Sequence, residues 1–182
     1  KSWSGLSVYD SNSNATGCDI SSNAHGNAAV QAGGKLELRG CQCNSSKDKC
    51  GLGVYRDCSV MAVACCFCDN ERHNIKARDG GKVELSDCQC NSSKGGGGLL
   101  AKNGGSATAS ASSISNNYGS NVQVRDGGVC VRLFHCRCDG SKRGWGMRGN
   151  SVHSHITAHS STAAGNFRGS RYPGVFVHCW QM

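Results

Sequence analysis

Apolar and polar residues alternate over short stretches throughout the chain. VEL at 83–85 and ATA at 107–109 are two examples, and a period of two is typical of a β-strand with one buried face. No stretch of the chain has the spacing of an amphipathic helix. The alternation therefore predicts an all-β protein made of short strands. The expected inward pairs are Leu36 and Leu38, Met61 and Val63, Val83 and Leu85, Ala107 and Ala109, and Val131 and Leu133.

The predicted strands belong to a repeat. Residues 33–47 (GGKLELRGCQCNSSK) and 80–94 (GGKVELSDCQCNSSK) differ at only three positions and lie 47 residues apart. Their shared motif, two alternating apolar residues followed by Cys-x-Cys and Asn, also recurs in weaker form about half as far apart. A fixed period in the low twenties predicts a solenoid, in which each coil buries its face by stacking on its neighbours. The first cysteine position of the motif falls at Cys18, Cys41, Cys66, Cys88, Ser112, Cys136, Thr157 and Cys179.

Each repeat contains three short strands. The alternating strand is followed by a second strand at Cys-x-Cys, and a third precedes the next glycines, as in IKA at 75–77. Three strands and three turns per unit predict a single-stranded parallel β-helix of about eight coils, each 21–25 residues long. We expect one domain over residues 1–182, with repeats from about 18 to 179. Residues 1–17 would form an N-terminal cap or a first partial coil, and residues 172–182 a C-terminal cap.

The repeat resembles that of a known superfamily. Two glycines, alternating apolar residues, a cysteine and an asparagine are similar to the right-handed parallel β-helix repeat of pectate-lyase-like proteins, especially their non-catalytic, cysteine-rich members. The resemblance covers about Cys18 to Cys179 and implies a right-handed β-helix. It implies no single activity, because this fold serves lyases, hydrolases, epimerases, adhesins and binding modules. The enzymes gather carboxylates on one face, whereas the acidic residues here are scattered, so no catalytic residue transfers and catalysis is disfavoured.

The chain contains 14 cysteines. Because free cysteine behaves as a small buried hydrophobe, packing inside a narrow coil is the favoured interpretation. Disulfides between adjacent coils come second. Zinc comes third, since zinc sites normally use Cys-x2-4-Cys pairs on loops, and we expect no metal or cofactor. The predicted structural ladder consists of Cys41, Cys43, Cys66, Cys68, Cys88, Cys90, Cys136 and Cys138.

The formal net charge of +8 favours an acidic partner. A basic residue followed by Asp or Asn precedes the glycines in four coils, which predicts a basic edge made of Arg56, Arg78, Lys102 and Arg125. The partner we expect is an acidic protein surface or a larger complex, with an acidic glycan as the alternative. Nucleic acid is disfavoured because the chain has no Lys/Arg tract or aromatic-plus-basic motif. For these four positions the favoured interpretation is that the Asp and Asn residues only cap their own turns, and the partner-binding edge is the alternative.

These features together predict a non-catalytic scaffold or protein-interaction subunit within a larger assembly. The alternative is a carbohydrate-active protein that binds or cleaves an acidic polysaccharide. No apolar run approaches the roughly 20 residues of a membrane span, so we expect a soluble protein. The chain starts at Lys1, which suggests processing or a fragment. An intracellular compartment or organelle lumen is favoured over secretion.

Overall fold

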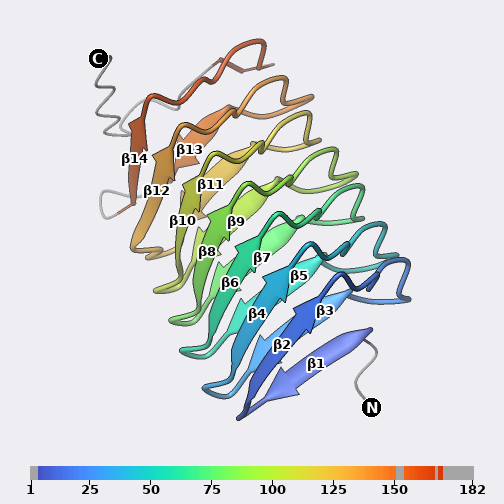
Figure 1. The fold of residues 1–182 in the computed structure, drawn as a ribbon. Coiled ribbons are helices and arrows are strands. Elements are labelled where there is room, and N and C mark those ends of the chain that lie inside the picture. The colour runs from blue at the N-terminus through green and yellow to red at the C-terminus, as the bar shows by residue number, and fades with distance from the viewer. Residues whose placement is uncertain (1–3, 151–153, 167, 170–182) are drawn as a thin grey trace.

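The chain winds into a parallel β-solenoid (Figure 1). The computed structural model describes residues 4–150, 154–166 and 168–169, and these contain strands but no helix. Sheet A is formed by β1 (Leu6–Tyr9), β3 (Ala28–Gln31), β5 (Leu52–Tyr55), β7 (Ile75–Arg78), β9 (Leu99–Lys102), β11 (Val122–Arg125) and β13 (Met147–Gly149). Sheet B is formed by β2 (Asn12–Thr16), β4 (Lys35–Arg39), β6 (Ser59–Val63), β8 (Lys82–Ser86), β10 (Ser106–Ser110), β12 (Cys130–Phe134) and β14 (His155–His159).

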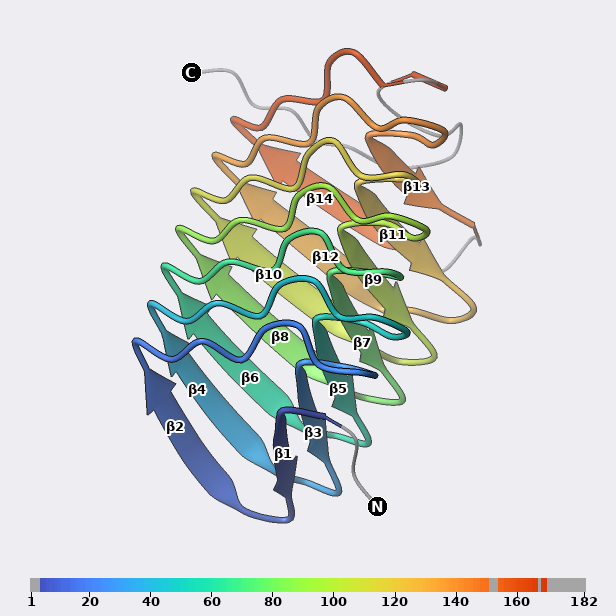
Figure 2. The same ribbon diagram turned by 90° about the vertical axis from the view of Figure 1, so that its right-hand side faces the viewer.

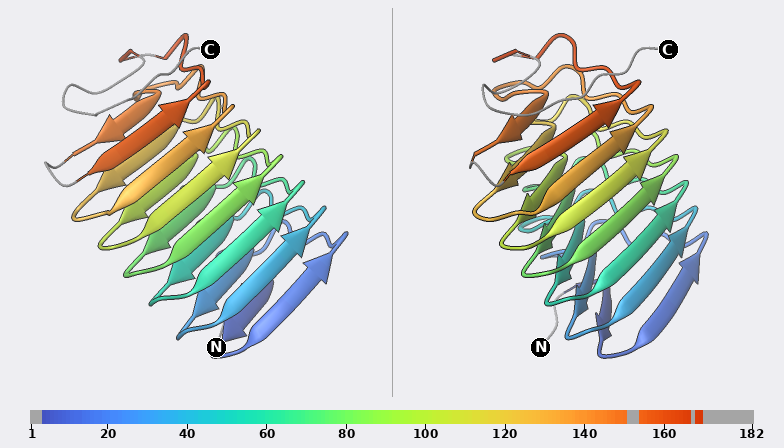
Figure 3. Two further views of the ribbon diagram at one scale, coloured as in Figure 1. Left: turned by 60° about the vertical axis from the view of Figure 1, so that its left-hand side comes forward. Right: turned by 90° about the vertical axis from the view of Figure 1, so that its left-hand side faces the viewer.

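Each strand pairs in parallel with the equivalent strand one turn away (Figures 2 and 3). The third side of each turn carries single β-bridges, which join Asp19, Gln42, Cys66, Gln89, Ser113, Arg137 and Thr162 into a third ladder. The described residues make about six turns, where we predicted about eight coils. Cys179, the predicted eighth position, and the predicted cap at 172–182 lie outside the described residues. Within the predicted N-terminal segment 1–17, the described residues 4–17 contain β1 and β2.

The core is a narrow column of small and medium apolar side chains between the two sheets. Four of the five predicted inward pairs of sheet B are buried, but the pair in β6 is wrong. Val60 and Ala62 point inward there, whereas Met61 is 38% exposed. The register fixes this assignment, because Val60 pairs with Leu36 on one side and with Val83 on the other.

The predicted repeat position is also wrong in two coils. In the third coil it belongs to Cys65, because Cys66 forms the bridge with Gln42 and Gln89, the residues that follow Cys41 and Cys88. In the seventh coil, Thr157 lies inside β14 and pairs with Arg132. Ser161 holds the repeat position instead: its hydroxyl accepts a hydrogen bond from the Cys136 N–H at 3.0 Å.

A chain of buried asparagine side chains runs along the solenoid. Asn27 Nδ2 donates to Asn70 Oδ1 at 3.0 Å, and Asn70 Nδ2 donates to Asn74 Oδ1 at 3.0 Å. Asn74 Nδ2 then donates to Asn117 Oδ1 at 2.9 Å. This series of hydrogen-bonded asparagines starts at Asn23, which donates to Asn27. At the other end it runs from Asn117 through Asn121 to Asn166. A buried amide group without a hydrogen bond would destabilise the fold, and each of these hydrogen bonds satisfies one buried N–H donor and one buried carbonyl acceptor.

This asparagine chain explains why the sequence repeat is 47 residues rather than one coil. Only every second coil carries the asparagine pair, and the coil between has serine and glycine at the equivalent places. The Ser93 N–H donates to Asn117 Oδ1 at 2.9 Å. A Cβ atom on Gly98 would lie only 2.7 Å from Asn117 Nδ2. One asparagine pair therefore serves two coils, and the intervening coil needs glycine to make room.

Candidate anion-binding groove

Strand alternation places a group of cations on the outer face of sheet A. In β7 the inward residues are Ile75 and Ala77, so Lys76 and Arg78 point outward. The strand register pairs Arg78 with Lys102, and Lys102 with Arg125. Three of the four residues of the predicted basic edge therefore form one column across β7, β9 and β11.

Arg56 does not belong to this column. Tyr55 is the residue that pairs with Arg78, and its ring centroid lies 4.9 Å from the Arg78 guanidinium carbon. Arg56 and Asp57 are the two central residues of the following turn, with φ values of 53° and 59°. The Cys58 N–H donates to the Tyr55 carbonyl across this turn at 3.4 Å, so the turn is of type I′.

The cations of sheet A are only partly neutralised. The Arg78 Nε lies 3.2 Å from Asp79, while Lys102 and Arg125 share Asp126 at 3.8 and 3.5 Å. Among the described residues, no carboxylate lies within 4 Å of the Lys76 ammonium.

The pKa of Lys76 reflects these neighbouring cations. Burial lowers the pKa of Lys76, and the charges of Arg78, Lys102 and Arg125 lower it further, against an opposite effect of Cys50. Lys76 therefore lies in a locally positive environment in which neighbouring cations disfavour its own charge.

A hollow of about 460 Å³ adjoins these cations. It lies between sheet A and the segments that return from the third ladder, and it is lined by Arg72, His73, Lys76, Leu100 and Arg125 together with Asp48, Cys50, Glu71, Gly95 and Gly96. The Asp48 carboxylate is engaged by His25 Nδ1 at 2.9 Å and lies 3.9 Å from Arg72. We call this hollow, with the adjoining Arg78 and Lys102, the basic groove. Lys76 and Arg72 were missed in the sequence because neither recurs from coil to coil.

His73 in the wall of the basic groove gives a pH-dependent prediction. Burial lowers its pKa from 6.5 to about 4, and Lys76 and Arg125 add to this shift. The Gly97 N–H donates to its Nδ1 at 2.8 Å, which requires that nitrogen to be unprotonated. Between pH 6.5 and pH 4 the unfolded chain therefore binds more protons than the folded chain, so stability falls as the pH falls through this window.

We expect His73 to lower the free energy of unfolding by roughly 2 kcal/mol between pH 7 and pH 4, after allowance for partial solvent screening. Urea unfolding at a series of pH values measures this slope. His73→Asn keeps a hydrogen-bond acceptor and should flatten it. An unchanged slope in that variant would show that His73 does not titrate as described.

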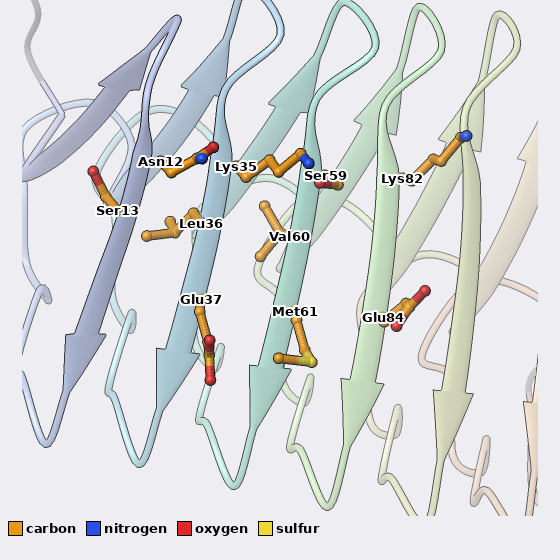
Figure 4. Close-up of a pocket in the computed structure, with 10 residues that line it drawn as sticks. All are labelled: Asn12, Ser13, Lys35, Leu36, Glu37, Ser59, Val60, Met61, Lys82 and Glu84. Atoms are coloured by element: carbon orange, nitrogen blue, oxygen red, sulfur yellow. The ribbon is translucent and has the colours of Figure 1, made fainter.

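A second hollow, of about 360 Å³, lies on the outer face of sheet B (Figure 4). Figure 4 shows Lys35 and Lys82 near the starts of their strands and Glu37 and Glu84 further along the same strands. Glu37 also pairs with Arg39. Cations and carboxylates are equal in number along this wall, so it has no preference for an anion.

The cysteines are mainly packing residues. Cys41, Cys43, Cys88, Cys90, Cys136 and Cys138 are buried in the core as predicted, and burial raises the pKa of Cys43, Cys90 and Cys138. Cys66 and Cys68 are not part of this ladder, because Cys65 and Phe67 occupy the two inward positions of their coil.

The thirteen described cysteines are free thiols, and Cys179 lies outside the described residues. Across the described ranges, no three His, Cys, Asp or Glu side chains converge on a point where a metal ion would bind. No helix in the described part of the chain has the length and apolar character to cross a membrane.

No protein-family model, curated protein or solved structure matches this chain. The parallel β-solenoid is thus known from the structure itself, while membership of the pectate-lyase-like superfamily stays a prediction.

Proposed function

We propose that this protein is a non-catalytic scaffold that binds an acidic segment of a protein partner in the basic groove. The observation that carries the proposal is Lys76, which is surrounded by Arg78, Lys102 and Arg125 and has no carboxylate partner among the described residues. An anion bound there would relieve the repulsion among these cations and raise the pKa of Lys76.

The shape of the site favours an extended partner. Arg78, Lys102 and Arg125 lie on successive strands, which are about 4.8 Å apart, so the column presents a positive charge at regular intervals. An extended peptide that crosses these strands projects alternate side chains to one face roughly 6.6 Å apart, so several of its acidic groups can lie along the column without matching it charge for charge. Strands in the stacked sheets hold these charges in fixed positions, which lowers the entropic cost of binding.

A protein segment fits better than a glycan. Leu100 lies beneath the groove but is only 1% exposed, so the groove presents charged groups rather than apolar area, which suits a segment rich in acidic residues. Sugar rings commonly stack on open aromatic faces, but the Tyr55 ring beside the groove is already covered by Arg78. The acidic polysaccharide is therefore the second candidate, and the same assay can test it.

The proposal is tested by titrating the protein into fluorescently labelled poly-L-glutamate and measuring anisotropy. We expect saturable binding that weakens about tenfold between 0.01 M and 0.15 M salt, because the Debye length falls from roughly 30 to 8 Å over this range. Absence of binding at low salt, or binding that salt does not weaken, would contradict the proposal. Tighter binding of polygalacturonate than of poly-L-glutamate would replace the protein partner with a glycan.

A further inference from the structure

Cys66 and Cys68 occupy outward positions that the two neighbouring coils fill with polar residues. The third ladder aligns Cys66 with Gln42 and Gln89. Two residues later, Cys68 takes the place of Asn44 and Asn91 in the neighbouring coils. Since Cys65 and Phe67 fill the core in this coil, packing gives no reason for the two outward cysteines.

The two thiols lie next to each other on the outside of the solenoid. Their sulfur atoms are 3.2 Å apart, and both residues are partly exposed. The backbone beneath them is fixed: the Cys66 N–H donates to the Cys41 carbonyl at 2.9 Å, and the Cys68 N–H donates to Asn44 Oδ1 at 2.7 Å. A disulfide needs the sulfurs to approach to about 2.05 Å and the Cα atoms to lie within about 6.8 Å; residues i and i+2 of an extended segment are roughly 6.6 Å apart, which is at the upper end of that range.

The two sulfurs differ in their chemistry. A hydrogen bond from Cys68 lowers the pKa of Cys66 to about 7, and Asn44 contributes to the same effect. The same contact raises the pKa of Cys68. At neutral pH a substantial fraction of Cys66 is therefore thiolate, the nucleophilic form, while Cys68 stays protonated. Cys65 has a pKa lowered to about 6, but it is only 2% exposed and so is shielded from reagents.

We propose that Cys66 and Cys68 form a reversible dithiol–disulfide site that exchanges with low-molecular-weight disulfides. In the forward direction the Cys66 thiolate attacks one sulfur of the small disulfide and displaces a small thiolate, which leaves a mixed disulfide on Cys66. Cys68 then gives up its proton to solvent and attacks the Cys66 sulfur, displacing the second small thiolate. The two protein thiols are oxidised to one disulfide, and one small disulfide is reduced to two thiols.

The test uses oxidised glutathione at neutral pH, followed by alkylation of the remaining thiols and mass spectrometry of peptides. In the wild-type chain we expect the peptide that carries both cysteines to lose two hydrogen atoms, and dithiothreitol to reverse the change. Cys68→Ser should instead retain glutathione on Cys66, because the second step is blocked. Cys66→Ser should leave Cys68 unmodified. Reaction at Cys66 should be at least about tenfold faster than at the exposed Cys18, because the hydrogen bond from Cys68 favours the thiolate of Cys66.

A matched control replaces both residues by those of the neighbouring coils, Cys66→Gln with Cys68→Asn. This variant should keep the far-ultraviolet spectrum and the unfolding midpoint of the wild-type chain and lose the rapid reaction. The proposal is overturned if both wild-type cysteines remain open to alkylation after glutathione treatment. It is equally overturned if Cys68→Ser carries glutathione on Cys18 in preference to Cys66.

Discussion

Replacing Asn117 with alanine should lower the free energy of unfolding by about 4 kcal/mol or more. Its Oδ1 accepts hydrogen bonds from the Ser93 N–H and from Asn74 Nδ2, both at 2.9 Å. Its Nδ2 donates to the Cys90 carbonyl at 3.1 Å and to Asn121 Oδ1 at 2.9 Å. Asn117 is fully buried, so the substitution removes the hydrogen bonds of the Ser93 N–H, of one Asn74 Nδ2 hydrogen and of the Cys90 carbonyl, each at a cost of roughly 1–3 kcal/mol. Asn121 Oδ1 keeps a hydrogen bond from the Asn117 backbone N–H at 3.3 Å. Urea unfolding followed by circular dichroism measures the loss.

Asn14→Ala is the matched control for this measurement. The same atoms are removed from an exposed position in β2, where the loss should be within about 0.5 kcal/mol. A similar, small effect of both substitutions would show that the asparagine chain does not stabilise the solenoid. It would also remove the explanation of the 47-residue repeat.

The fold could be predicted from the sequence because two independent periods agree. Alternation indicated strands, and a spacing in the low twenties indicated stacked coils. The register failed in the third coil, where MAVACCFC at 61–68 contains only small or apolar residues. Alternation cannot distinguish the inward from the outward face of such a stretch, so the sequence predicts Cys66 and Cys68 as core residues, whereas the structure places Cys65 and Phe67 there.

The basic groove was only partly predictable. Arg78, Lys102 and Arg125 recur at equivalent places, and their column follows from the repeat. The sequence aligns Arg56 with Arg78 because the dipeptide Arg-Asp occurs at both 56–57 and 78–79. In the structure the strand register is shifted by one residue, so that Tyr55 pairs with Arg78. Counting from the apolar residues of β5 would have aligned Tyr55 with Arg78.

Two other features of the molecule could not be predicted from repetition. The outward position of Lys76 is visible in the alternation of β7, but its neighbours one turn away, Gly53 and Leu100, carry no charge. The asparagine chain depends on contacts between side chains that are 43 residues apart in the sequence. This separation arises because the two residues of each contact belong to coils that are two turns apart. Such contacts require the stacking geometry as well as the local pattern.

The double substitution Lys76→Glu with Arg125→Glu should weaken poly-L-glutamate binding about a hundredfold. Each reversal removes an attraction and adds a repulsion, and a loss of about 1.4 kcal/mol per site corresponds to a factor of ten. The fold should survive, because Lys76 forms no ion pair among the described residues and its surroundings contain the cations Arg78 and Lys102. A glutamate at position 76 would therefore face favourable neighbours. The Arg125 substitution removes only an exposed ion pair with Asp126, which contributes about 1 kcal/mol or less.

The most direct test of the proposed binding site compares this variant with Lys35→Glu combined with Lys82→Glu. Those two lysines are exposed and line the hollow of sheet B, and their reversal changes the net charge of the protein by the same amount. Anisotropy titrations of labelled poly-L-glutamate at low salt should show a loss of about a hundredfold for the sheet A pair and less than about threefold for the sheet B pair. Equal losses in the two variants would show that the positive charge of the whole molecule attracts the ligand, and would contradict a binding site at the basic groove.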